Sequence, residues 1–197
     1  FQGASMLTEV QLPSTLTSIG SRAFQSCSGL SEIKLPEGLT EIDNWAFEYC
    51  TGLVSLKLPD TVTRIGYKAF ADCTNLASIN YPLALKNAGN YNGGFLFDGT
   101  KISSIIVPEG VTALPSDVFQ GASMLTEVQL PSTLTSIGNS AFSGCSQLSA
   151  LCIPVGVTQV GSTAFAGCTE LVQVAFLGTK CSFGKNAFRD SENVLFY

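Results

Sequence analysis

Histidine is absent from the sequence, and charged residues make up only 13% of its 197 residues. Without histidine, the chain can form neither a Cys/His zinc site nor an imidazole base. No nucleophile has a recognisable base partner, and no glycine loop has the strand–turn–helix context that phosphate binding requires. The dispersed acidic residues also lack an EF-hand pattern. We therefore expect a protein without enzymatic activity, cofactor or metal.

Basic residues are also few. Ten Lys and Arg residues stand against fifteen Asp and Glu residues, which gives a net charge of −5. The basic residues are scattered, whereas nucleic acids and anionic membrane surfaces are bound by clustered positive charge. We therefore expect no nucleic-acid partner. No apolar stretch approaches the roughly 20 residues of a membrane-spanning helix, so we also expect no membrane insertion by this chain.

One pattern, 23 residues long, recurs along the chain. Phenylalanines at its first position lie 23 residues apart in two runs, namely Phe1, Phe24, Phe47 and Phe70, then Phe119, Phe142, Phe165 and Phe188. A fixed period of this length predicts a solenoid in which each copy is one coil. We therefore interpret residues 1–197 as a single elongated domain. Because the sequence starts and stops within a repeat, we expect it to be a fragment of a longer array.

Each repeat contains two short apolar segments. In the first, Ile33 and Leu35 alternate with polar residues and precede Pro36, which predicts a brief strand that ends at a turn. The second, with Leu39 and Ile42, predicts another brief strand. The Ala-Phe-x-x-Cys segment then turns the chain back, and we expect a 3₁₀ or single helical turn there. Stacked about 4.8 Å apart, the strands form two narrow parallel sheets around one apolar core.

One repeat departs from the frame. The segment 90–95 contains three extra residues, so Leu96 is predicted to take the phenylalanine position, and Asp98 and Gly99 replace the cysteine-containing turn. Asn and Gly in the segment predict a protruding loop. The loop is either a binding feature that includes Tyr91 or a tolerated insertion.

Two distant repeats are identical over twenty residues, from Phe1 to Gly20 and from Phe119 to Gly138. Stacking geometry alone does not demand this identity, because other copies differ at their exposed positions. The identity indicates recent duplication. An array that gains and loses coils in this way suits a scaffold of adjustable length better than a fixed catalytic pocket.

The pattern L-x-x-I-x-L-P-x-x-L-T-x-I-G-x-x-A-F-x-x-C resembles the BspA-like (Treponema pallidum-type) leucine-rich repeats over essentially the whole chain. One copy is carried by Leu30, Ile33, Leu35, Pro36, Leu39, Thr40, Ile42, Ala46, Phe47 and Cys50. The resemblance implies a right-handed leucine-rich-repeat solenoid, chiefly in secreted or surface proteins of host-associated bacteria. Some members of the family are implicated in adhesion to host proteins and other cells. The resemblance implies no catalytic residues.

The seven cysteines are Cys27, Cys50, Cys73, Cys145, Cys152, Cys168 and Cys181. Five of them occupy one repeat position, which Ala4, Gly99 and Ala122 are predicted to fill in other coils. Replacement by small residues indicates a small buried group. Disulfides between adjacent coils are within Cα reach, but parallel side chains seldom give the required dihedral, so we favour free thiols. Cys152 lies at an outward strand position and is either a reactive thiol or a tolerated substitution.

The outward-facing positions are the candidates for binding. The first strands present a flat polar strip that includes Glu32, Lys34 and Lys57. Such a strip is the usual binding face of a solenoid, but it is also simply a solvated one.

Aromatic residues gather near one turn. Trp45, Tyr49, Tyr67 and Lys68 lie at positions that are mostly small or polar in other coils. Trp and Tyr are over-represented in binding hot spots, so we predict a contact patch there, with local packing as the alternative.

These observations predict an extracellular protein–protein interaction module of the adhesion type, secreted or on a bacterial cell surface. Its partner would be a protein or glycan on a host or neighbouring cell, and we expect the chain to be a monomer. The alternative is a passive structural stalk without a ligand of its own.

Overall fold

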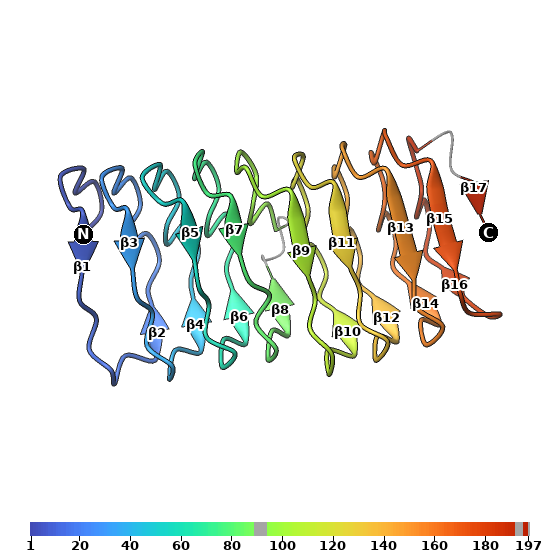
Figure 1. Ribbon diagram of the computed structural model, residues 1–197, viewed down its shortest axis with the longest axis horizontal. Helices are drawn as coiled ribbons and strands as arrows, with labels where there is room; N and C mark the ends of the chain where they lie inside the picture. Colours follow the sequence, from blue (N-terminus) through green and yellow to red (C-terminus); the bar gives the residue numbers. More distant parts are fainter. Residues whose placement is uncertain (89–93, 192–194, 197) are drawn as a thin grey trace.

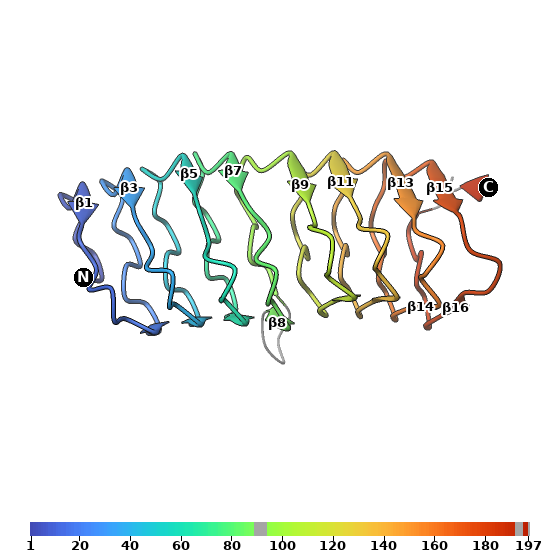
Figure 2. The ribbon, with the colours of Figure 1, turned by 60° about the horizontal axis from the view of Figure 1, so that its bottom comes forward.

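The structure is a computed structural model and describes residues 1–88, 94–191 and 195–196. The main chain winds in successive coils along one axis, with the first and last coils at opposite ends (Figure 1). Seen from a second direction, the strands lie along two opposite sides of the stack (Figure 2). The solenoid predicted from the 23-residue period is confirmed.

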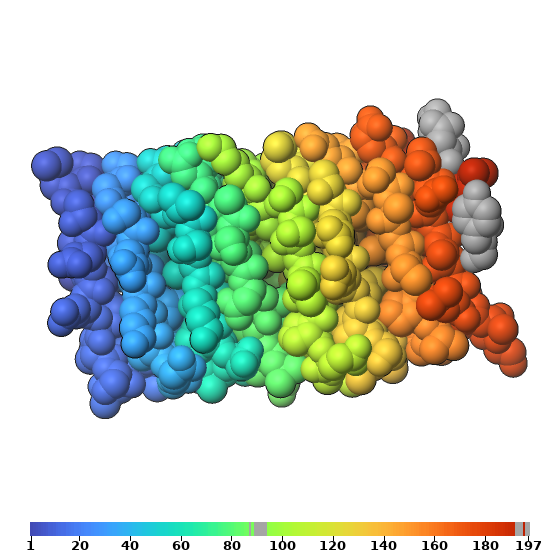
Figure 3. All heavy atoms as spheres, viewed as in Figure 1, coloured from blue at the N-terminus to red at the C-terminus, as the bar shows by residue number. Residues whose placement is uncertain are grey.

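The first strand of each coil lies on one side of the solenoid, which we call the first face. These strands are β1 (Glu9–Val10), β3 (Glu32–Ile33), β5 (Ser55–Leu56), β7 (Ser78–Ile79), β9 (Ser104–Ile106), β11 (Glu127–Gln129), β13 (Ala150–Ile153), β15 (Gln173–Phe176) and β17 (Leu195–Phe196). In the space-filling view, the coils form parallel bands across this face (Figure 3).

The second strand of each coil lies on the other side, which we call the second face. These strands are β2 (Ser18–Ile19), β4 (Glu41–Ile42), β6 (Arg64–Ile65), β8 (Asn87–Ala88), β10 (Ala113–Leu114), β12 (Ser136–Ile137), β14 (Gln159–Val160) and β16 (Ser182–Phe183). The strands are short because only two to four residues of each segment lie close enough to the neighbouring coil to form ladder hydrogen bonds.

All strand pairs are parallel, and most are offset by one repeat. On the second face, Glu41 pairs with Arg64 and Ile42 with Ile65, so equivalent residues lie side by side. Strands β2, β4, β6 and β8 form one four-stranded sheet, and β10, β12, β14 and β16 form another. The first face is divided into two- and three-stranded sheets. This in-register stacking explains why the sequence repeats so strictly.

The core is a continuous column of the repeated apolar residues. Along β3 and β4, Ile33 and Ile42 point inward and are buried, whereas Glu32 and Glu41 are exposed. Phenylalanine rings of successive coils stack nearly parallel, with centroids 5.2 Å apart for Phe24 and Phe47 and interplanar angles of 8°. The column is buried at Phe24, Phe47, Phe70, Phe119, Phe142 and Phe165.

The turn segment contains no helix in any coil of the described residues, although we expected a 3₁₀ or single helical turn. The segment is a series of tight turns, each closed by a main-chain hydrogen bond to the residue three positions earlier. The Cys27 N–H donates to the Phe24 carbonyl at 3.1 Å, for example. Arg22 and Ser26 have positive φ angles of 58° and 60°. These left-handed residues interrupt any continuous helix.

The frame of the irregular repeat differs from the prediction. Phe97, rather than Leu96, takes the phenylalanine position, since its ring stacks on Phe70 with centroids 6.1 Å apart. Leu96 takes the preceding alanine position, and its carbonyl accepts the Phe70 N–H. Phe97 lies 27 residues after Phe70, so the repeat gains four residues rather than three. The larger ring fills the column better than leucine, and this decides the frame.

The position predicted for Gly99 is also corrected. Thr100, which is buried, occupies the cysteine position three residues after Phe97, and Gly99 takes the preceding left-handed position with φ of 69°. In the last coil, Ser191 fills the cysteine position, and its hydroxyl donates to the Phe165 carbonyl at 2.8 Å. The position therefore accepts small residues such as Ala122, and its hydroxyl and thiol side chains donate to a phenylalanine carbonyl.

The cysteine position forms a ladder of buried thiols. The thiols of Cys27, Cys50, Cys73, Cys145 and Cys168 each donate to the phenylalanine carbonyl of the preceding coil, at 3.0–3.2 Å. All seven cysteines are free, and Cys152 is exposed, as the sequence predicted.

Candidate binding surface

Aromatic side chains of neighbouring coils meet along the turn side of the solenoid. The rings of Trp45 and Tyr67 lie edge to face, with centroids 5.6 Å apart and an interplanar angle of 87°. The guanidinium of Arg22, one coil earlier, lies 4.6 Å from the centroid of the Trp45 ring. A cation over an indole face is attracted by the negative potential of the ring. Arg22 thus covers one face of Trp45.

The row continues into the irregular repeat. Phe95 lies edge to face against Tyr67, with centroids 6.4 Å apart and an interplanar angle of 90°. The Lys68 Nζ lies 5.8 Å from the Tyr67 ring centroid. We call Arg22, Trp45, Tyr67, Lys68 and Phe95 the aromatic edge. Phe95 was missed as a candidate because the sequence assigned it to the inserted loop, and Arg22 because it lies in another coil.

Tyr49 extends this surface past the phenylalanine column. Its side chain is 48% exposed. The carboxylates of Asp72 and then Glu48 raise the pKa of the Tyr49 phenol, and the ammonium of Lys68 partly offsets them. The structure brings together three of the predicted residues, Trp45, Tyr67 and Lys68, and Tyr49 lies four residues after Trp45 in the same turn segment.

The main chain under this surface is held in a left-handed conformation. The φ angles are 55° at Trp45, 60° at Tyr49 and 52° at Lys68. Residues with side chains usually avoid this region because Cβ approaches the following carbonyl. The turn geometry imposes it in every described coil, and several coils place glycine at the position of Tyr49. A bulky ring at this position is unusual.

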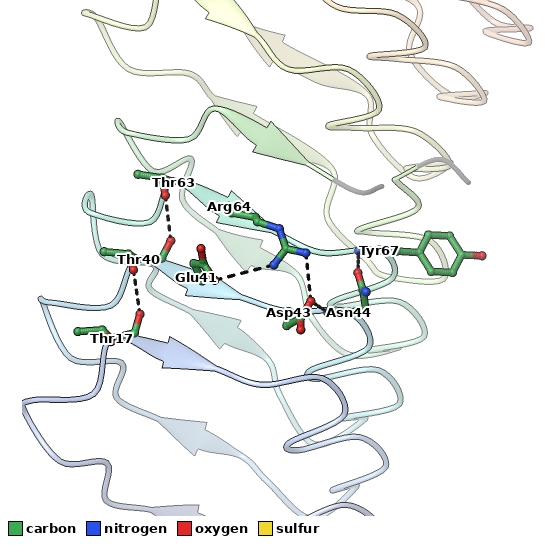
Figure 4. Close-up of polar contacts among 8 residues, drawn as sticks. All are labelled: Thr17, Thr40, Glu41, Asp43, Asn44, Thr63, Arg64 and Tyr67. Atoms are coloured by element: carbon green, nitrogen blue, oxygen red, sulfur yellow. Dashed lines mark hydrogen bonds and ion pairs between the residues drawn. The ribbon is translucent and has the colours of Figure 1, made fainter. Parts of the chain in front are cut away.

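Polar side chains of the second face form a hydrogen-bond network that reaches the main chain of Tyr67 (Figure 4). The Asn44 Oδ1 accepts a hydrogen bond from the Tyr67 N–H at 2.8 Å. The Asp43 Oδ1 accepts the Asn44 N–H at 2.8 Å and a bond from the Arg64 guanidinium at 3.2 Å. Glu41 lies 4.0 Å from the same guanidinium. This network links β4 and β6 to the turn and fixes the main chain at Tyr67.

The remaining predicted residues do not belong to this surface. Glu32, Lys34 and Lys57 are exposed on or directly after β3 and β5, on the first face. They belong to the polar strip of that face rather than to the turn side. Tyr91 lies outside the described residues. The eight predicted residues therefore do not form one site.

The first face also contains a shallow hollow of about 410 Å³ over β11, β13 and β15. Small side chains line it, among them Ala150, Ala175 and the exposed Cys152. Within the described ranges, no group of three or more His, Cys, Asp or Glu side chains could hold a metal ion. That same part of the chain also contains no helix with the length and apolar character needed to cross a membrane.

Parallel in-register coils, an inward leucine and isoleucine pattern and a phenylalanine column define a leucine-rich-repeat solenoid. More particularly, the chain belongs to the family of BspA-type leucine-rich repeat regions, whose model matches residues 1–92 and 93–195.

Solved structures of bacterial leucine-rich repeat proteins resemble this one. A protein from Bacteroides ovatus shares 27% identity over 98% of this chain, with a TM-score of 0.76, and this chain spans 55% of its length. A Treponema pallidum leucine-rich repeat protein shares 34% identity, with a TM-score of 0.64, over 75% of this chain and 68% of its own. No curated protein matches the sequence.

A third similar structure has an informative name. It is described as a leucine-rich cell surface protein from Faecalibacterium prausnitzii. It shares 25% identity with a TM-score of 0.50, and the match covers 95% of this chain and 58% of that protein.

Proposed function

We propose that this solenoid is an extracellular interaction module of the adhesion type, displayed on or secreted from a bacterial cell. Its role is to present an extended, rigid surface to a protein on a host or neighbouring cell. The chain acts by binding rather than by catalysis and carries no cofactor.

The observation that carries this proposal is the aromatic edge. Trp45, Tyr67 and Phe95 lie in a row on the turn side, flanked by two cations, and Tyr49 is half exposed beside them. Large rings and an arginine are the side chains that most often dominate the energy of protein interfaces. The rings are held by contacts with each other, so little side-chain entropy is lost on binding.

The cell-surface location is supported by family membership and by the name of the Faecalibacterium prausnitzii structure. A passive stalk is the second candidate. It is favoured by the identical segments 1–20 and 119–138, because duplication of whole coils lengthens a spacer without requiring a conserved contact surface.

Binding of the isolated chain to immobilised matrix and plasma proteins tests the proposal. An interaction module should bind at least one of them, and the monomeric chain in solution should show the same binding. A stalk should bind none. If a ligand is found, Trp45→Ser should weaken binding at least tenfold, as expected when a hot-spot ring is truncated.

A matched control is available at the same repeat position. Ser140 occupies the position of Trp45 in a remote coil and has the same left-handed main chain, with φ of 52°. Ser140→Ala should leave binding unchanged. Equal affinities of the Trp45→Ser variant and the unaltered chain, with both folded by circular dichroism, would remove the aromatic edge from the contact surface.

A further inference from the structure

The sheet of the second face is divided at the irregular repeat. Strands β2, β4, β6 and β8 form one parallel sheet, and β10, β12, β14 and β16 form another. No pairing between described strands joins β8 to β10. Figure 1 shows these two strands more widely separated than β6 and β8 or β10 and β12. The division is confined to this place on the second face of the described chain.

Proline replaces a conserved feature of the repeat at this division. Within each sheet, the residue after the strand, which is usually glycine, donates its N–H to the preceding coil. Gly66 donates to the Ile42 carbonyl at 2.7 Å, and Gly138 donates to the Leu114 carbonyl at 3.0 Å. Pro115 takes this position after β10. Proline has no N–H, so β10 lacks the donor that would connect it to β8.

The ladder of turns is interrupted between the same coils. The Phe70 N–H donates to the Leu96 carbonyl at 3.2 Å, and the Phe119 N–H donates to the Ala141 carbonyl at 2.8 Å. In the described chain, no equivalent main-chain bond runs from the turn of Phe97 to the turn of Phe119. A side-chain bond partly replaces the ladder, from the Gly94 N–H to the Gln120 Oε1 at 2.8 Å.

The core is also less well packed at this division. Ring centroids are 6.1 Å apart for Phe70 and Phe97 and 6.3 Å apart for Phe97 and Phe119. Elsewhere in the column the spacings are 5.0–5.6 Å. The Tyr81 hydroxyl is buried here without a hydrogen-bond partner in the described structure. It lines a cavity with Phe97 and Phe119 that has room for about one water molecule.

We propose that the solenoid consists of two separately cooperative stacks that meet at a weak joint, which opens before either stack unfolds. In a repeat protein, cooperativity is transmitted only through the interfaces between neighbouring coils. Where the sheet, the turn ladder and the ring column all weaken together, one stack can lose its structure while the other keeps its own. Heat or a pull along the axis separates the molecule at this joint first.

The chain crosses the joint in the segment 101–103. The turn of Phe97 bonds to the preceding coil, since the Asp72 N–H donates to the Asp98 carbonyl at 2.7 Å. Strand β9, by contrast, pairs with β11. Among the described residues, the N-terminal stack is therefore 1–88 and 94–101, and the C-terminal stack begins at residue 102.

Hydrogen–deuterium exchange of the full chain, read by mass spectrometry on peptides from each stack, tests the proposal. Ile42→Val in β4 and Ile137→Val in β12 form a matched pair, because both residues are buried and occupy the same repeat position. Each substitution removes one methylene group, a change mild enough to preserve folding. Each should accelerate the slowest-exchanging amides of its own stack about fivefold and leave those of the other stack unchanged.

Acceleration of the slowest amides in both stacks by either substitution would show one cooperative unit and overturn the proposal. A variant of the joint itself provides a second measurement. Tyr81→Phe removes the unpartnered hydroxyl while keeping the ring, so it should slow opening at the joint. With a strengthened joint, the effects of Ile42→Val and Ile137→Val should spread further into the opposite stack than in the unaltered chain. If Tyr81→Phe did not change how far these effects extend into the opposite stack, the weak coupling would not lie at this joint and the proposal would be overturned.

Discussion

At the scale of single residues, the repeat position occupied by cysteine shows how the neighbouring coils determine the surroundings and the hydrogen bond of a side chain. A thiol there is surrounded by core and donates to a carbonyl of the preceding coil, as the Cys50 thiol does to Phe24 at 3.0 Å. Ser191 and Thr100 also keep a hydroxyl bonded to a phenylalanine carbonyl, which explains why they are accepted. The position stabilises the stack and holds its thiols away from solvent.

Reactivity of the thiols should follow this burial. The thiolate is the reactive form, and burial raises the pKa of Cys168 to about 12. Raising the pH from 7 to 9 therefore leaves the Cys168 thiol protonated. An aromatic disulfide reagent should modify Cys152 within minutes, Cys181 more slowly and the other five only after unfolding. Absorbance of the released thiolate measures this, and the fast phase should vanish in Cys152→Ser; its persistence there would contradict the assignment.

The left-handed residue Tyr49 allows a prediction about strain. Glycine takes the same turn position, with positive φ, in five other coils, at Gly3, Gly99, Gly121, Gly144 and Gly167. A side chain in this conformation costs about 1–2 kcal/mol. Glycine loses about 0.5–1 kcal/mol more chain entropy on folding, so Tyr49→Gly should stabilise the fold by about 0.5–1 kcal/mol.

Urea denaturation measures this effect. Ser26→Gly is the matched control, since Ser26 has the same turn position and a φ of 60°. Both variants should shift the midpoint upward by similar amounts. A lower midpoint for Tyr49→Gly alone would mean that the ring makes stabilising contacts that outweigh the strain. If Tyr49 belongs to the contact surface, the same variant gains stability while it loses binding.

At the scale of structural elements, the phenylalanine column joins the coils more directly than the two-residue strands do. Phe70 is fully buried and stacks on Phe47 and Phe97. Phe70→Ala should destabilise the protein by about 3–5 kcal/mol, because it removes a ring and leaves a cavity that neighbouring coils can close only partly. Val54→Ala, at a residue 58% exposed, should change stability by less than about 0.5 kcal/mol. Similar denaturation midpoints for the two variants would contradict the interior position of Phe70.

The sequence predicts most elements because period and burial agree. Alternation places Ile33 inward and Glu32 outward, and the 23-residue spacing fixes the register of β3 against β1. The frame of the irregular repeat was not predictable, since Leu96 and Phe97 are both apolar and adjacent. Only the stacking of the Phe97 ring on Phe70 decides between them. The number of residues in the repeat does not show which of two adjacent apolar side chains enters the column.

The aromatic edge was predictable only in part. Trp45 and Tyr67 were recognised because their positions are polar in other coils. Their contact joins different repeat positions. Trp45 lies directly before the Ala-Phe pair of its coil, and Tyr67 lies one position earlier in the next coil. Arg22 reaches Trp45 across one coil, and Phe95 reaches Tyr67 from the irregular repeat. Such contacts depend on the lateral offset of the coils, which a linear pattern does not contain.

At the scale of the whole molecule, stability is the sum of interfaces between neighbouring coils. The identity of segments 1–20 and 119–138 shows that the same twenty residues fit in different surroundings. Both pair with coils of the same design, since β1 pairs with β3 and β11 pairs with β9, each over a 23-residue offset. A whole coil is therefore an exchangeable unit.

This exchangeability predicts the outcome of deleting one coil. Removal of residues 142–164 joins Ala141 to Phe165, which restores the Ala-Phe turn and the register of every later strand. The shortened chain should fold, with an unchanged shape of its circular dichroism spectrum and a cooperative but less stable denaturation. Removal of residues 142–163 is the control, because it leaves Ala164 extra and shifts the phenylalanine frame by one residue. A one-residue shift exchanges inward and outward faces of a strand, so this control should lose the ordered C-terminal stack. Equal folding of the two deletions would mean that register is set within each coil rather than by its neighbours.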